Sequence, residues 1–368
     1  MKQLLVIAIA LTSVNAFATR ARTLALGSSP HLIDTNTVYA KPYDMFRLGG
    51  DYVVLETGAT GGLTQTAANS NAEGMIVRTM GDAKLGLSLG HQSQNASSWG
   101  LRGANTLAPA ALKVNQQNPI EFSYGMKTGD IAWAGTLVYS NYNNKVATAG
   151  TLEKESSMGV RFGATSGAWD GALSLGLANT ANIVSGNKFT GTSAIGLNGG
   201  YQMDTMYFFG NFVTAGAKEE DNAGTQAFKI NNQTLSLGVV NSHKKDGNDL
   251  FYSVALNQGL TNTTTGAAAE VKTTTLSLPI VIGLEVEAAS WMTLRGSVSQ
   301  STLINSSKTE QSGVSLAETD PGANTTTVAL GAGLKFNKLT FDGTLSTATT
   351  QTVNTTNLLA QAGMTYWF

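Results

Sequence analysis

The stretch IEFSYGMKTGDIAWAGTL, residues 120–137, contains two runs in which apolar side chains occupy every second position. This period of two is typical of a β-strand with one apolar face. Turn residues separate the runs, and a two-residue turn at 128–129 would place Met126 opposite Ile131. The apolar side chains of both runs then share one face. The stretch therefore predicts two antiparallel neighbours joined by a tight turn.

Three further hairpins follow the same pattern, with expected turns at residues 166–167, 204–205 and 337–338. A slip of one residue in any of them would move the apolar side chains to the opposite face. The expected opposite residues are Val160 and Leu173, Tyr201 and Phe208, and Leu334 and Phe341. Agreement among four hairpins indicates a long antiparallel meander.

Sixteen strand candidates follow one another in residues 51–368, and fourteen is the alternative because the first two are short. They lie near 51–57, 74–80, 82–91, 118–127, 130–141, 157–165, 168–178, 193–203, 206–216, 228–243, 249–259, 274–288, 292–301, 325–336, 339–347 and 357–368. Longer polar segments alternate with the tight turns, at 92–117, 142–157, 179–192, 217–227, 260–273, 302–324 and 348–356. Short periplasmic turns and long outer loops are typical of outer-membrane barrels.

Two fold classes fit this pattern: a soluble all-β protein with the apolar face as its core, and a transmembrane antiparallel β-barrel. Strands of about ten residues match a tilted membrane crossing. Aromatic side chains gather at the short-turn ends, as in interfacial girdles. The other face is small and polar, and only 13% of the chain is charged, against about 25% in soluble proteins. The sequence therefore favours an all-β barrel of the bacterial outer membrane.

The composition also argues against several functions. A formal net charge of −1 excludes a basic nucleic-acid surface. The chain has no Cys, so it has neither disulfides nor a thiolate metal site. Its three histidines, His31, His91 and His243, fall on separate elements, and no G-x-S-x-G motif sits at a strand-to-helix turn. We expect no enzyme activity, no cofactor and no metal.

The N-terminus has the organisation of a secretory signal peptide. Lys2 precedes an apolar run at 4–11, and Ala16-Phe17-Ala18 forms an A-x-A cleavage site. We therefore expect a signal peptide at 1–18 and a mature chain that begins at Thr19. Residues 19–50, called the N-terminal segment below, combine prolines with apolar side chains, which predicts an irregular segment packed at the periplasmic mouth or in the lumen. Residues 51–368 would form the barrel.

The C-terminus, AQAGMTYWF at residues 360–368, continues the period of two up to a terminal aromatic residue. With Tyr366 and Phe368, it resembles the C-terminal assembly signal of bacterial outer-membrane barrels. The resemblance implies that the barrel-assembly machinery recognises this strand, which then closes against the first one.

The stretch ARTLALGSSPHLIDTNTVYAKPYDMF, residues 21–46, resembles the N-terminal segment of porin-like outer-membrane proteins. It is most similar to the major outer-membrane proteins of bdellovibrio-type predatory bacteria. The resemblance implies a porin-like barrel in outer-membrane lipid. The chain departs from the trimeric porins, because it lacks their acidic constriction-loop motif, so its oligomeric state stays open.

Charged residues on the polar face are the candidates for lining a pore. They are Glu121, Lys127, Asp130, Arg161, Asp170, Glu285, Glu287, Arg295, Lys335 and Asp342. Strand neighbours predict that Arg161 lies near Asp170, Lys335 near Asp342, and Arg295 near Glu285. Glu285 and Glu287 would form the unbalanced acidic pair of a mildly cation-selective lumen.

Three functions remain. The favoured one is a porin for passive diffusion of small hydrophilic solutes and ions, because sixteen strands leave an aqueous interior. The first alternative is a structural or surface-interaction protein whose lumen is plugged by the N-terminal segment or by an outer loop. A transporter for hydrophobic solutes is less favoured, because it would need an apolar pocket inside the barrel.

Overall fold

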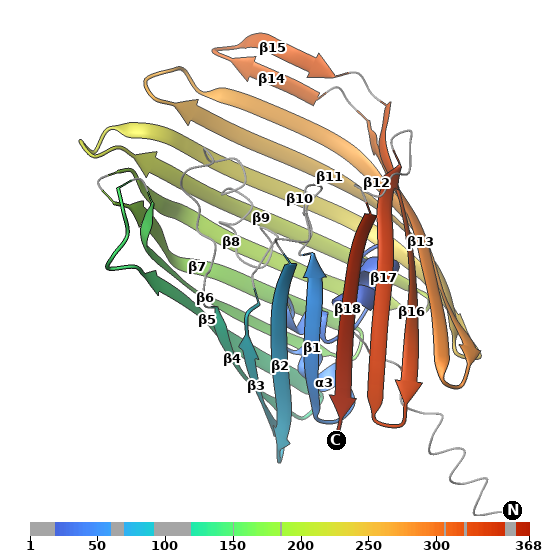
Figure 1. The fold of residues 1–368 in the computed structure, drawn as a ribbon. Coiled ribbons are helices and arrows are strands. Elements are labelled where there is room, and N and C mark those ends of the chain that lie inside the picture. The colour runs from blue at the N-terminus through green and yellow to red at the C-terminus, as the bar shows by residue number, and fades with distance from the viewer. Residues whose placement is uncertain are drawn as a thin grey trace, which may run out of the picture.

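The computed structural model describes residues 19–59, 70–91, 119–149, 151–184, 186–304, 307–319, 322–349 and 358–368. The expected signal peptide and most of the segments 92–117 and 348–356 lie outside these ranges. All strands belong to a single antiparallel sheet (Figure 1). The first strand, Tyr52–Ala59, pairs with the second strand and also with the last, so the sheet closes on itself. The protein is therefore an all-β closed barrel.

The strand bounds agree with most of the expected candidates. The strands are β1 (Tyr52–Ala59), β2 (Ser70–Met80), β3 (Ala83–Leu89), β4 (Ile120–Thr128), β5 (Ile131–Asn143), β6 (Leu152–Ser166), β7 (Trp169–Ile183), β8 (Lys188–Met203), β9 (Met206–Glu220), β10 (Gln226–Lys245), β11 (Asn248–Thr265), β12 (Val271–Ala289), β13 (Met292–Leu303), β14 (Ser307–Gln311), β15 (Val314–Thr319), β16 (Gly322–Phe336), β17 (Leu339–Thr349) and β18 (Leu358–Trp367).

Sixteen of these strands form the wall, as expected from the sequence. β13 pairs directly with β16, so the short hairpin of β14 and β15 lies outside the ring. β14 pairs instead with the loop end of β12, and Figure 1 shows the hairpin at the upper rim. The segment 302–324, expected as a loop, therefore includes this hairpin.

The strands on one side of the barrel are longer than expected. β10 has 20 residues, β12 has 19 and β11 has 18, whereas β3 has only 7. These extensions include much of the segments 217–227 and 260–273, which the sequence predicted as loops. Polar ladders such as Asn231 opposite Asn262 continue the pairing there. A polar sequence in these segments therefore indicates where a strand leaves the membrane, but it does not indicate where the strand ends.

Two of the four hairpin registers are as expected and two differ. Tyr201 lies opposite Phe208 and Leu334 lies opposite Phe341, as predicted. Met126, however, lies opposite Trp133, a shift of two residues from the prediction. In the same way Val160 lies opposite Leu175. A shift of two residues leaves every side chain on the same face, so the alternation of the sequence could not detect it.

The outward face is apolar over the whole ring. At alternate positions it exposes Leu137, Phe162, Leu197, Ile282 and Leu345, each at 48% or more. A closed barrel leaves no unpaired strand edge, which hydrocarbon would not tolerate. Closure together with an apolar exterior makes this chain a β-barrel of the bacterial outer membrane. In the described part of the chain, no helix is long and apolar enough to cross a membrane.

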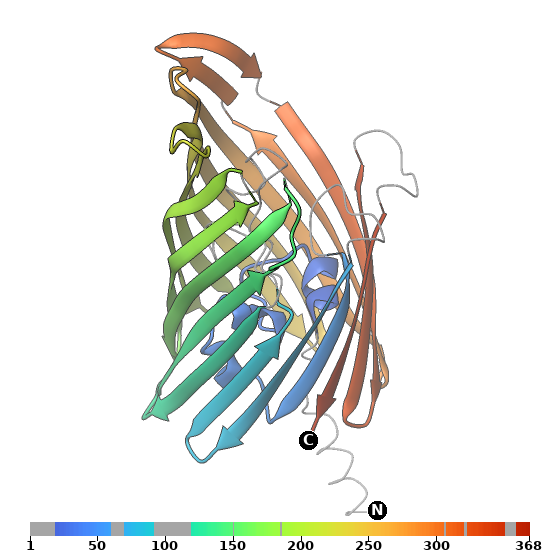
Figure 2. The same cartoon turned by 60° about the vertical axis from the view of Figure 1, so that its left-hand side comes forward.

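Three short helices of the N-terminal segment lie within the ring of strands (Figure 2). They are α2 (Arg20–Ala25), the 3-10 helix η1 (Asn36–Tyr39) and α3 (Asp44–Arg47). α2 contacts β13, β16, β17 and β18. Glycines of the wall permit this close approach: a Cβ on Gly331 would lie 2.6 Å from the Cβ of Ala25. The N-terminal segment thus packs directly on the inner wall.

Candidate functional site: the barrel lumen

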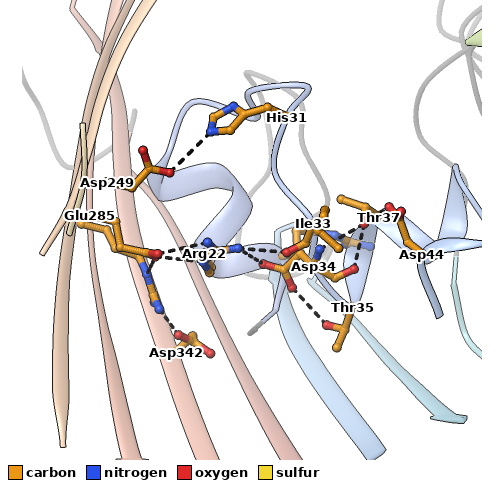
Figure 3. Close-up of polar contacts among 12 residues, drawn as sticks. Arg22, His31, Ile33, Asp34, Thr35, Thr37, Asp44, Asp249, Glu285 and Asp342 are labelled. Atoms are coloured by element: carbon orange, nitrogen blue, oxygen red, sulfur yellow. Dashed lines mark hydrogen bonds and ion pairs between the residues drawn. The ribbon is translucent and has the colours of Figure 1, made fainter. Parts of the chain in front are cut away.

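The first contact of the N-terminal segment with the wall centres on Arg22 of α2. Its guanidinium donates hydrogen bonds to both carboxylate oxygens of Glu285 on β12, at 2.8 and 3.0 Å. It also donates to Asp34 within the segment, at 3.3 Å (Figure 3). On the wall, Glu285 accepts a second hydrogen bond from Arg295 at 2.6 Å, and Arg295 also binds Asp342. These five residues form the Arg22 cluster.

The second contact centres on Arg20. Its backbone N–H donates to Glu56 on β1 at 2.8 Å, and its guanidinium binds Glu73 on β2. Glu73 also lies 2.9 Å from Nδ1 of His91. The ring of Tyr39 stacks on His91 with 3.5 Å between the centroids. We call Arg20, Glu56, Glu73 and His91 the Arg20 cluster.

The third contact lies on another part of the wall, at Asp170 of β7. Tyr43 donates its hydroxyl to this carboxylate at 2.8 Å, and Lys41 approaches it at 3.4 Å. Arg47 lies 3.5 Å from the same carboxylate, and Tyr207 on β9 donates to it at 3.0 Å. Asp170, Tyr43, Lys41, Arg47 and Tyr207 form the Asp170 cluster. The N-terminal segment is therefore attached to the wall at β1 and β2, at β12 and at β7.

Burial changes the protonation of several groups in the N-terminal segment. Asp34 is fully buried, and this desolvation raises its pKa to about 7 although Arg22 acts in the opposite direction. Burial also lowers the pKa of His31, whose Nε2 lies 3.6 Å from Asp249. Burial raises the pKa of Asp44 in the same way. Packing in the barrel thus disfavours charge on these side chains.

The ten pore candidates of the sequence fall into three groups. Glu121, Arg161, Asp170, Arg295 and Asp342 are buried on the inner wall, and Glu285 is half-buried there. Lys127, Asp130 and Glu287 are exposed at the short-turn end. Lys335 is half-buried on β16 near the same end.

Several predicted pairings of these residues were wrong. Arg161 binds Glu121 two strands away, at 2.6 Å, rather than Asp170. Asp342 binds Arg295 rather than Lys335. Arg295 does lie beside Glu285, as the adjacent strands predicted. Glu285 and Glu287 are not an unbalanced pair, because two guanidiniums contact Glu285. Long side chains in a barrel reach across strands and onto the N-terminal segment, so pairing along one hairpin does not determine their partners.

The sequence analysis missed the acidic residues of the first strands. Glu56 and Glu73 occupy inward positions on β1 and β2, and both are buried. The sequence did contain a signal for them. In each of these two strands, a carboxylate occupies a position on the inward face. Arg20, which contacts both acids, is one of four basic residues in the N-terminal segment, and this number of bases was a signal that the segment binds acidic residues of the wall.

The inner wall is also less uniformly polar than expected. Phe189, Phe228 and Ile230 form a buried apolar cluster on β8 and β10. Nearer to the N-terminal segment, Phe251 packs with Leu26 and Leu32. The expectation of a small, polar inner face therefore holds for only part of the wall.

A series of polar atoms on the inner faces of β7 to β11 has no protein partner among the described residues. They belong to Ser174, Asn179, Asn198, Asn211 and Asn257. Asn198 and Asn211 lie opposite each other on β8 and β9. Buried amide and hydroxyl groups without protein partners are normally hydrogen-bonded to water. This part of the lumen is therefore suited to hold water.

Comparison with known proteins gives only distant structural likenesses. No family model matches the chain, and no curated protein matches it. Among solved structures, the chain is similar to the CymD monoaromatic hydrocarbon channel, with a TM-score of 0.48, 10% identity, and coverage of 95% of this chain and 97% of that chain. It is also similar to a FadL homologue of Pseudomonas aeruginosa, with a TM-score of 0.45, 12% identity, and coverage of 97% and 98%. An anion-selective porin from Comamonas acidovorans gives a TM-score of 0.39, 14% identity, and coverage of 87% and 97%.

These structures are all β-barrels, and their likeness to this chain is too distant to bear on its solute. The assignment of the protein to the β-barrels of the bacterial outer membrane rests on its own closed sheet and apolar exterior. The resemblance to bdellovibrio-type proteins remains a prediction.

Proposed function

We propose that the protein is a passive diffusion channel for small hydrophilic solutes and ions, in which the N-terminal segment forms the constriction. The observation that supports it is the series of unpartnered amide and hydroxyl groups on the inner faces of β7 to β11. These groups need water, so under this proposal they belong to a hydrated part of the lumen that polar solutes cross. The proposal involves no covalent step and no cofactor.

The partners follow from this proposal. Outer-membrane lipid covers the apolar exterior, and the barrel-assembly machinery recognises the terminal strand with Tyr366 and Phe368. Small hydrophilic solutes enter at the rim that carries the long outer loops and leave past the short turns at the other end of the barrel. The signal peptide directs the chain to the periplasm before insertion.

A second candidate is a structural or surface-interaction protein with a closed lumen. The three clusters that hold the N-terminal segment favour it, because Arg22, Arg20 and Asp170 attach the segment to different parts of the wall. A segment held in this way could close the path completely. The two candidates differ in conductance.

The test is single-channel recording in planar bilayers with the protein purified from outer membranes. The diffusion channel predicts steady conductance of the intact protein and a larger conductance after deletion of residues 20–47. A closed lumen predicts conductance only after the deletion. Heat-modifiable mobility on gels confirms that each barrel is folded, and a Lys145→Gln variant at an exposed turn serves as the matched control. If neither folded protein conducted ions, the proposed channel function would be wrong.

A further inference from the structure

Thr19, the first residue of the N-terminal segment, lies in a fully buried position. Its exposed fraction is 0%. Its side chain rests on Gly363 of β18, where any Cβ would overlap it. Its backbone carbonyl accepts hydrogen bonds from Arg22 N at 2.9 Å and Thr23 N at 3.3 Å, which starts α2. Thr19 is thus held against the wall by its side chain and linked to the first turn of α2 by its carbonyl.

Two acidic residues flank the glycine on which Thr19 rests. Gly363 pairs with Glu56 on β1 and with Asp342 on β17. The three residues therefore form one row across adjacent strands, with the glycine in the middle and Thr19 above it. Both acids are buried, at 9% and 4% exposure.

Several polar atoms around Thr19 have no hydrogen-bond partner. Among the described residues, Oε2 of Glu56 and Oδ2 of Asp342 have no hydrogen-bond partner. The hydroxyl of Thr19 itself and that of Thr365, two residues from Gly363 on β18, have none either. Buried carboxylate oxygens are costly to leave unpaired, so a donor is expected at this place.

Carboxyl groups outnumber guanidiniums around α2. The Arg22 and Arg20 clusters contain five carboxyl groups and three guanidiniums, apart from His91. Nε of Arg20 lies 3.9 Å from Oε2 of Glu56. An ammonium group at Thr19 would favour the ionised form of the carboxyl groups nearest to it.

We propose that removal of residues 1–18 creates an α-ammonium group at Thr19 that pairs with Glu56 and Asp342 and thereby fixes the N-terminal segment inside the barrel. The reaction is hydrolysis of the Ala18–Thr19 peptide bond by a signal-type endopeptidase. Water supplies the oxygen of the new Ala18 carboxylate, and the released amine of Thr19 takes up a proton. The inference rests on the cleavage site that the sequence predicts, and it holds whether or not the barrel conducts.

The backbone places the new group next to a residue that binds Glu56. The N–H of Arg20 donates to Glu56 Oε1 at 2.8 Å. Thr19 has an extended ψ of 178°, which places its nitrogen about 3.6 Å from that of Arg20. The α-ammonium would therefore lie one residue from the N–H that binds this carboxylate, whereas an uncleaved chain would carry a neutral amide at this position.

The test measures how accessible this amine is. The mature protein is purified from outer membranes, its N-terminus is sequenced, and an amine-acylating reagent is applied at neutral pH to the folded and the denatured protein. Because an ion pair favours the protonated amine, which does not react, we expect the α-amine to be labelled about tenfold more slowly in the folded state. The Lys338 side chain, exposed at a turn, is the internal control.

Variants locate the partners of the amine. Glu56→Gln and Asp342→Asn should each accelerate labelling, whereas Glu153→Gln at the opposite end of the barrel should not. If these variants fail to fold, two refolded chains replace them, one beginning at Thr19 and one at Ala18. The longer chain should exchange the amides of residues 20–47 faster. A mature N-terminus other than Thr19, an unprotected α-amine, or equal exchange in the two chains would overturn the proposal.

Discussion

Asp34 shows how a single buried residue makes attachment of the N-terminal segment depend on pH. Burial raises its pKa to about 7, above the ordinary 3.8. The packed segment therefore favours the protonated acid, and this contribution is complete below pH 3.8 and is lost as the pH rises through 7. Arg22 and Arg295 face Asp34 and partly offset the loss, while Asp342 adds to it.

We expect hydrogen exchange of residues 20–39 to become faster as the pH rises from about 4 to about 7, after correction for the intrinsic rate, and to level off above pH 7. Asp34→Asn keeps an acceptor for Arg22 and removes the ionisation, so its exchange should accelerate less over this range. The lowered pKa of His31 acts in the opposite direction, and this contribution is common to both proteins. An equal slope in both proteins would show that Asp34 is not the responsible group.

The terminal residue has a second role in the folded barrel. The N–H of Phe368 donates to the carbonyl of Asp51 at 3.1 Å, and the guanidinium of Arg78 lies 5.1 Å above its ring. The chain end thus reinforces the seam between β18 and β1. The sequence predicted that the assembly machinery recognises this residue, and the two roles can be separated.

Deletion of Phe368 should lower the amount of folded protein in the outer membrane, as measured by heat-modifiable mobility. Arg78→Ala leaves the terminal residues intact. It should therefore preserve that amount and reduce the free energy of unfolding by about 1 kcal/mol, because it removes the exposed cation–π contact together with the exposed ion pair to Asp51. Equal amounts of wild type and the deletion variant would remove the role in assembly.

At the level of elements, the faces of the strands could be predicted but the turn positions only in part. Each of the four hairpins has a residue with positive φ first in its turn: Gly129, Gly167, Asp204 and Asn337. The expected turns at 128–129 and 166–167 placed these glycines second, which shifted the register by two residues. Tight hairpin turns need positive φ at the first position, and this rule would have corrected both.

This rule gives a prediction for Gly129, whose φ is 60°. Gly129→Ala should lower the free energy of unfolding by about 1–2 kcal/mol, because an L-residue is strained in this conformation. Gly129→Asn should cost less, since Asn337 adopts a φ of 56° at the equivalent place. Urea titration of the refolded barrel in detergent compares the variants. Equal losses for both would contradict the assignment of the turn.

The N-terminal segment marks the limit of prediction for elements. Its apolar residues and prolines indicated an irregular, packed segment. Its partners lie on β1, β2, β7 and β12, which are far apart in the sequence, and alternation within a strand carries no information about a segment that crosses the lumen. Its basic residues were the usable signal, because the inner wall carries an excess of acid.

At the scale of the whole molecule, Glu285 and Glu287 have different tasks although they stand two positions apart on β12. Glu285 accepts hydrogen bonds from Arg22 and Arg295, so it attaches the N-terminal segment to the wall. Glu287 is exposed at the short-turn end, where water and salt screen its charge. If the protein is the proposed channel, Glu285 would help to set the width of the path, and Glu287 would add a weak field at its exit.

Glu285→Gln should therefore increase single-channel conductance and make it noisier, because loss of the carboxylate frees the N-terminal segment to move. Glu287→Gln, its matched control, should keep the conductance and only reduce the mild cation preference, read as the reversal potential across a salt gradient. That second effect should fade at high salt, because the screening length falls to about 3 Å at 1 M. If instead Glu285→Gln changed the reversal potential and left the conductance unaltered, the N-terminal segment would not form the constriction, and Glu285 would act on ions directly.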